Sequence, residues 1–231
     1  MPGYSIELDL RDRTTLVVGL GEVGRRKAAG LVAVGAWVVG VDPEVATRAM
    51  PAGVEVRAEP YRVEHLRGVS LVFAAAPATV NRVVVADARR AGVWVCSASE
   101  PDAGDFTVPA VWRDGPLTVT VSTAGASPAL AVALRDRAAE ALGPAAAGLV
   151  ALLAEFRPEV RARLAAPEVR RRLLADWADP RWLDILTAEG PDAVRRRLAR
   201  ALDDAAQGAA GSGSAPTLGT RACRPEDREG L

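Results

Sequence analysis

The chain has 231 residues, enough for one domain of ordinary size and a smaller second unit. Its 29 basic residues balance 29 acidic ones, which excludes a global charge that would recruit nucleic acid or a membrane surface. Two distant cysteines and a single histidine fit no metal or disulfide framework, so we expect no resident metal.

The first residues lack the charged start and the apolar core of a signal peptide. No apolar stretch reaches the roughly 18 residues that a membrane-spanning helix needs. From these two features we expect a cytoplasmic protein.

A glycine-rich turn follows the first strongly apolar run, at residues 15–24 (TLVVGLGEVG). Gly19 permits a sharp turn out of a strand, and Gly21 lets a pyrophosphate approach the backbone at the start of the next helix. Gly24 lets that helix pack close to the strand. This G-x-G-x-x-G spacing, between a strand and a helix, predicts a dinucleotide-binding site.

The next apolar strand, expected over residues 37–41, ends in Asp42. An acidic side chain at this distance from the glycines accepts hydrogen bonds from the adenosine ribose and repels a 2′-phosphate. We therefore expect NAD as the cofactor in preference to NADP.

Strands and helices alternate through the first half of the chain, which predicts an α/β fold with a doubly wound parallel sheet of the Rossmann type. The segment 4–10 is expected to be a short entry strand. The other strands are expected over 15–18, 37–41, 54–57, 71–76 and 93–98, and the helices over 21–34 and 80–91.

The pattern changes after residue 100. Two strand-like segments, 106–112 and 117–122, are joined by a turn and followed by a helix from about residue 129 to 142, with Ser127 at its N-cap. Residues 148–206 are expected to be helical, and the run after Gly208 lacks core residues, which favours disorder.

Several local strings together resemble the precorrin-2 dehydrogenase family of siroheme biosynthesis, which also forms the N-terminal module of bacterial siroheme synthases. They are LDLRDR before the first strand, VVGLGEVGRRKAAGLVAVGA at the glycine turn, Asn81 after the fourth strand, and VSTAGASPAL at residues 121–130. The resemblance runs from about Tyr4 to Leu142 and more loosely to about Ala206.

This resemblance implies NAD-dependent oxidation of precorrin-2 to sirohydrochlorin, and some members of the family also insert Fe²⁺ into the product as ferrochelatases. It implies a homodimer with a small α+β dimerisation segment after the nucleotide domain. Together with the pattern of elements, this gives an expected division into residues 1–111 (NAD-binding), 112–147 (dimerisation), 148–207 (helical) and 208–231 (a disordered tail). By position, Glu22, Val23, Pro43 and Glu44 are expected to contact NAD.

Two departures from the family pattern affect the expected chemistry. The sequence SASEPD at 97–102 replaces the usual N-V-x-D-x-P, so the acid/base carboxylate falls to Glu100, Asp105 or Asp102, or these residues are only a solvated acidic turn. Residues 76–78 (APA) stand where members usually have T-D-D. These changes keep open an alternative, a protein that binds NAD(H) or a tetrapyrrole as a sensor or carrier with weakened turnover.

The substrate that this resemblance implies carries eight carboxylates, which need hydrogen-bond donors. Ser122, Thr123 and Ser127 precede a helix N-terminus, where hydroxyls and backbone amides bind anions. The same three residues are equally suited to capping that helix, and the sequence favours neither role.

Overall fold

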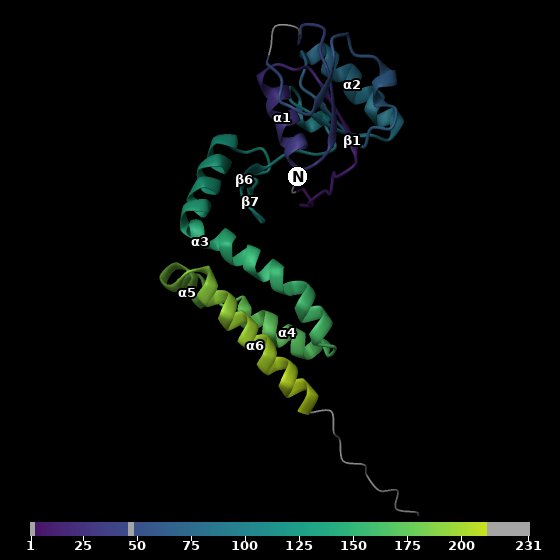
Figure 1. The fold of residues 1–231 in the computed structure, drawn as a ribbon. Helices are drawn as coiled ribbons and strands as arrows, with labels where there is room; N and C mark the ends of the chain where they lie inside the picture. Colours follow the sequence, from purple (N-terminus) through teal and green to yellow (C-terminus); the bar gives the residue numbers. More distant parts are fainter. Residues whose placement is uncertain (1–2, 46–48, 212–231) are drawn as a thin grey trace, which may run out of the picture. The chain divides into compact units, whose positions relative to one another are not determined.

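The computed structural model describes residues 3–45 and 49–211. The chain divides into two compact units, Met1–Pro109 and Ala110–Leu231. The first is an α/β domain, and the second consists of a β-hairpin followed by helices (Figure 1).

A five-stranded parallel sheet with the order β3-β2-β1-β4-β5 forms the centre of the first unit. β1 lies between β2 and β4, so its carboxyl end is the point at which the strand order reverses, where ligands bind in such sheets. The strands are β1 (Thr14–Val18), β2 (Trp37–Val41), β3 (Val54–Arg57), β4 (Leu71–Ala74) and β5 (Trp94–Ser97). This sheet confirms the expected Rossmann-type fold class.

Two helices cover opposite faces of this sheet. α1 (Glu22–Ala33) packs on the face that includes Val17 and Phe73. α2 (Ala78–Ala91) packs on the face that includes Leu16, Val72 and Val95. The connection from β3 to β4 contains only a short 3₁₀ turn, η2 (Val63–Leu66), in place of a long crossover helix. Another 3₁₀ turn, η3 (Pro101–Ala103), follows β5.

The second unit begins with an antiparallel hairpin of β6 (Ala110–Asp114) and β7 (Leu117–Val121). It continues through α3 (Pro128–Arg163), α4 (Pro167–Trp177), α5 (Arg181–Glu189) and α6 (Pro191–Gly211). The helical core is built around Trp177, Val194, Leu198 and Leu202, which are all fully buried. Residues 208–211, expected to open the tail, lie in α6, and the rest of that expected tail falls outside the described residues.

The long helix α3 is interrupted at Gly143, whose φ of 65° and ψ of 175° are not helical. Pro144 follows directly and starts the second half, and Figure 1 shows the resulting bend. Before the break, Arg135 donates a hydrogen bond to the carbonyl of Val111 in the hairpin, at 3.3 Å. After the break, Leu152 and Phe156 join the helical core.

By length and composition, α3 also meets the criteria for a membrane span, with an 18-residue window of mean hydropathy 1.4, of which 28% is buried. The sequence reading expected no apolar stretch of this length. The sequence expectation concerned an uninterrupted apolar stretch, whereas the mean hydropathy of a window is raised by the many alanines of α3. Core helices of proteins outside membranes meet the same criteria, so this single helix is weak support for a membrane location.

Candidate functional site

The glycine turn after β1 is shaped by two very close backbone approaches. Gly19 has a φ of +90°, and a Cβ on it would lie 2.4 Å from the backbone nitrogen of Ala76. A Cβ on Gly24 would lie 1.8 Å from the carbonyl oxygen of Gly19. Neither position can carry a side chain without moving the backbone, so the turn out of β1 and the approach of α1 both require glycine.

Gly21 differs from these two glycines because the space in front of it is open. Apart from Gly21 itself, its two chain neighbours and the adjoining helix backbone, no atom of the described residues lies within 4 Å of the position that its Cβ would take. Gly21 is the N-cap of α1, and no side chain there accepts a hydrogen bond from the first turn, which begins with Glu22 and Val23. Open space in front of uncapped helix amides is the arrangement that binds a diphosphate. These residues therefore fit the expected cofactor.

Asp42 lies at the end of β2 and is 8% exposed. One carboxylate oxygen accepts the backbone N–H of Leu20 at 2.7 Å, and the other accepts the N–H of Glu44 at 2.8 Å. Pro43 and Glu44 themselves are exposed. A carboxylate accepts about four hydrogen bonds, so these contacts are compatible with binding a ribose as well. Asp42 thus joins the end of β2 to the glycine turn, a role that the sequence did not predict.

A polar network links the carboxyl ends of β4 and β5. Asn81, only 1% exposed, accepts the backbone N–H of Ala76 at 3.0 Å and donates to the hydroxyl of Ser99 at 2.9 Å. The neighbouring Arg82 donates to Glu100 at 2.8 Å and forms an ion pair with it. Asn81 and Arg82 therefore fix the loop that carries Glu100. An amide on the buried face of an apolar helix is the sequence signal for this role.

The three candidate carboxylates do not lie together. Glu100 and Asp102 follow the carboxyl end of β5, but the carboxylate of Asp105 accepts the N–H of Val95 at 3.0 Å, near the start of that strand. The backbone N–H of Asp105 also donates to the carbonyl of Val95 at 2.7 Å. Asp105, one of the three expected acid/base candidates, therefore lies away from the carboxyl edge, because the chain turns back along β5 after η3.

Gly104 makes that return possible, since a Cβ there would lie 2.9 Å from the carbonyl oxygen of Val95. Arg89 on α2 approaches the Asp105 carboxylate at 3.6 Å. Asp105 is thus positioned to secure the edge of the sheet, and Glu100 is the carboxylate placed at the carboxyl edge by a charged partner.

Ser122, Thr123 and Ser127 lie in the second unit, where their hydroxyls bond to their own loop. Ser122 accepts the N–H of Ala124 at 3.2 Å, and Ser127 accepts the N–H of Leu130 at 3.2 Å as the N-cap of α3. Thr123 accepts the N–H of Ser127 at 3.1 Å and donates to its carbonyl at 3.0 Å. The geometry supports the capping alternative, and a role in substrate binding stays a prediction.

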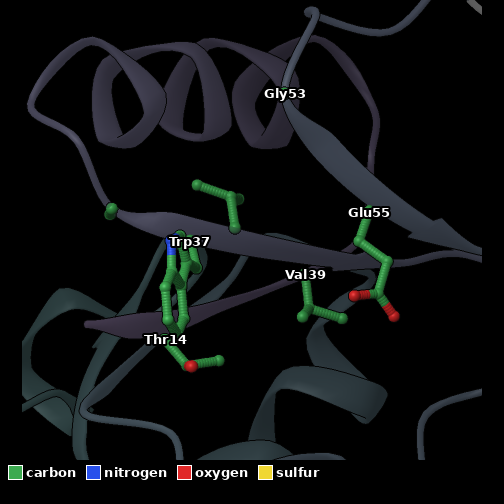
Figure 2. Close-up of a pocket in the computed structure, with 7 residues that line it drawn as sticks. Thr14, Trp37, Val39, Gly53 and Glu55 are labelled. Carbon is green, nitrogen blue, oxygen red and sulfur yellow. The ribbon is translucent and has the colours of Figure 1, made fainter. Parts of the chain in front are cut away.

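A shallow pocket lies at the opposite, amino edge of the sheet (Figure 2). It is lined by Thr14 and Trp37, the first residues of β1 and β2, together with Val39, Gly53 and Glu55. Parallel strands place all their carboxyl ends at the other edge, so this pocket is separate from the glycine turn. Among the described residues, no group of three or more histidine, cysteine or acidic side chains is arranged to hold a metal ion.

A parallel sheet with a glycine turn after β1, an open helix N-terminus and a carboxylate at the end of β2 defines a Rossmann-type NAD(P)-binding protein. Residues 6–110 match the family described as putative NAD(P)-binding, and residues 114–137 match the family described as the central part of the sirohaem biosynthesis protein.

Two curated relatives are similar to most of the chain. The siroheme synthase of Nitrosomonas eutropha is 36% identical over 178 residues, which cover 74% of this chain and 37% of the relative. That of Methylobacillus flagellatus is 39% identical over 177 residues, covering 74% of this chain and 38% of the relative. The chain thus spans less than half the length of these relatives.

The solved structure of SirC, a precorrin-2 dehydrogenase, superposes with a TM-score of 0.68 at 22% identity, covering 86% of this chain and all of that one. This likeness supports the fold. The chain is therefore similar to siroheme synthases in sequence and to a precorrin-2 dehydrogenase in fold, the family that its motifs resemble.

Proposed function

We propose that this protein oxidises precorrin-2 to sirohydrochlorin and uses NAD as the hydride acceptor. The observation that carries the proposal is the open, uncapped N-terminus of α1 at Gly21, beside the carboxylate of Asp42. The similarity to siroheme synthases and to a precorrin-2 dehydrogenase suggests the class of substrate. The reaction removes two hydrogens from the tetrapyrrole, one as a hydride to NAD and one as a proton to a base or to water.

Each part of the proposed site has a separate task. The first amides of α1 bind the diphosphate, with Glu22 and Val23 at the contact, and Asp42 holds the ribose while Pro43 and Glu44 flank it. NAD, when bound, supplies the electrophilic ring that takes the hydride. Glu100 accepts the proton, and Arg82 orients its carboxylate for that transfer.

The choice of NAD over NADP follows from charge. Two carboxylates, Asp42 and Glu44, stand at the end of β2, and Arg57 at the end of the neighbouring β3 is paired with Glu55 at 2.9 Å. A 2′-phosphate would meet negative charge there and would desolvate the buried Asp42 carboxylate further. Calorimetry with NADH and NADPH tests this, and equal affinities would contradict it.

The same proposal includes a homodimer in the cytoplasm. Leu130, Val132, Leu134 and Leu142 on the first half of α3 are between 37% and 51% exposed, an apolar surface that a second copy would cover. Sedimentation at increasing concentration measures the oligomeric state, and a monomer at all concentrations would remove the dimer from the proposal.

The decisive experiment is an anaerobic assay with precorrin-2 and NAD. We expect the absorption spectrum of sirohydrochlorin to develop together with that of NADH. Binding of NAD and precorrin-2 without either spectrum would favour the alternative, a sensor or carrier. Glu100→Gln should lower kcat and leave NAD affinity unchanged, whereas Asp102→Asn, a matched change on the same loop, should keep wild-type turnover. Equal rates for both variants would remove Glu100 from the mechanism.

The cofactor site has its own matched pair of variants. Gly21→Ala introduces a methyl group into the diphosphate space, and its φ of −63° accommodates alanine without strain. Gly30→Ala adds the same group to open space further along α1. We expect Gly21→Ala to weaken NAD binding by at least about tenfold, about 1.4 kcal/mol, with no loss of stability. Unchanged binding in Gly21→Ala would refute the placement of the diphosphate.

A further inference from the structure

Lys27 is the only lysine of the chain, and its side chain is half-buried on α1. Its ammonium nitrogen lies over the ring of Phe73, 5.6 Å from the ring centre. Phe73 in turn packs edge to face on Phe106, with the ring centres 5.5 Å apart. The thiol of Cys96, on β5, is close enough to interact electrostatically with Lys27.

These neighbours place Lys27 at the β4 and β5 side of the site. Phe73 and Cys96 are each the second-last residue of their strand, so both lie near the carboxyl edge. The network of Asn81 with Ala76 and Ser99 stands at the same edge, where the same two strands end. Lys27 is therefore on the nicotinamide side of the proposed site, on the face of the sheet that α1 covers.

Lys27 has no carboxylate partner in the described part of the chain, although arginines along both units are paired with acidic side chains. Among the described residues, the charged side chain that acts on Lys27 is Arg26, which repels it. Burial lowers the pKa of the Lys27 ammonium, and burial raises the pKa of the Cys96 thiol, so that the thiol stays neutral near pH 7. A partly desolvated cation without a counter-ion is unfavourable unless a ligand supplies the negative charge.

We propose that Lys27 binds a carboxylate of the tetrapyrrole substrate. This inference rests on the proposed function, because that function supplies a substrate with many carboxylates. The other anion in the reaction, the diphosphate, belongs at the first turn of α1, whereas Lys27 lies one turn later and toward β4 and β5. An ammonium that is already half-desolvated over an aromatic ring binds a carboxylate more strongly than a fully hydrated one.

Steady-state kinetics test the proposal with three variants. Lys27→Met keeps the length of the side chain and removes its charge, Lys27→Arg keeps the charge, and Arg26→Met removes the charge of the exposed neighbouring residue. We expect Lys27→Met to raise KM for precorrin-2 by about tenfold or more, as loss of a charge-assisted hydrogen bond requires, with NAD affinity unchanged. Lys27→Arg should recover part of that loss, and Arg26→Met should behave as wild type.

An unchanged KM in Lys27→Met would overturn the proposal while leaving the proposed function intact. Absence of turnover in the wild-type protein would instead refute the proposed function. Urea unfolding of Lys27→Met shows whether the variant is folded. Its stability should equal or exceed that of the wild type, because the substitution removes a cation from a half-buried site.

Selective acetylation provides a second readout that does not depend on turnover. Amine-reactive reagents can modify only Lys27 and the α-amino group, and the latter serves as an internal reference in mass spectrometry. We expect sirohydrochlorin to slow acetylation of Lys27 relative to the α-amino group, and NADH alone to leave it unchanged. Protection by NADH alone would assign Lys27 to the cofactor, and protection by neither ligand would show that no anion binds there; both results overturn the proposal.

Discussion

Replacing Asp42 should reveal its structural task separately from its proposed contact with ribose. One of its carboxylate oxygens accepts the backbone N–H of Leu20 at 2.7 Å, and the other accepts that of Glu44 at 2.8 Å. A hydrogen bond to a charged acceptor contributes about 1.5–3 kcal/mol. Asp42→Asn keeps one acceptor oxygen and turns an NH₂ group toward the other N–H. We therefore expect it to lower the free energy of unfolding by about 1.5–3 kcal/mol.

Asp42→Ala removes both acceptors and leaves the amide of the fully buried Leu20 unpaired, so its loss should be larger, about 3–5 kcal/mol. Urea unfolding, followed by circular dichroism, measures these values. Glu44→Gln is the matched control, because it changes an exposed carboxylate and keeps the backbone N–H, and we expect a change within about 0.5 kcal/mol. A midpoint for Asp42→Asn equal to that of the wild type would refute this account of the glycine turn.

Three further predictions concern stability. Asn81→Ala should lower the free energy of unfolding by about 1–3 kcal/mol in a urea titration, because it leaves the N–H of Ala76 unpaired. Trp177 is fully buried, and its indole N–H has no partner in the described part of the chain. In thermal unfolding we expect Trp177→Ala to lower the free energy of unfolding by about 3–5 kcal/mol and Trp177→Phe to lower it much less. Because burial lowers the pKa of Lys27, the unfolded chain binds more protons just below the ordinary lysine pKa; stability should rise with pH through that window, and the rise should be smaller in Lys27→Met.

The sequence was sufficient to predict the sheet and the cofactor turn because both depend on local chemistry. The apolar strands alternate with helices, and the three glycines occupy positions where backbone geometry leaves no other choice or where a phosphate needs open space. Prediction was weaker for segment 4–10, which was expected to be a short entry strand. In the structure that segment pairs with no strand among the described residues, and Tyr4 is 92% exposed. A strand needs a neighbouring strand to pair with, and the local sequence does not specify one.

The positions of the candidate carboxylates also depend on contacts that the local sequence does not specify. Glu100 and Asp105 are five positions apart, yet a backward turn that depends on Gly104 separates them along the length of β5. The contact of Asp42 with Leu20 spans 22 positions and that of Asn81 with Ser99 spans 18, and no local pattern specifies such pairs. The types of residue at the site were predictable, but their pairing required the fold.

The break in α3 has a consequence for local opening of the backbone. A φ of 65° with a ψ of 175° is available almost only to glycine, so residue 143 cannot be replaced without moving the chain. The helical series of backbone hydrogen bonds is interrupted there. The half before Gly143 is protected from solvent by its packing on the hairpin, and the half after it by its packing in the helical core. Amide hydrogen exchange should therefore report two protection levels within one helix, with a discontinuity at this glycine.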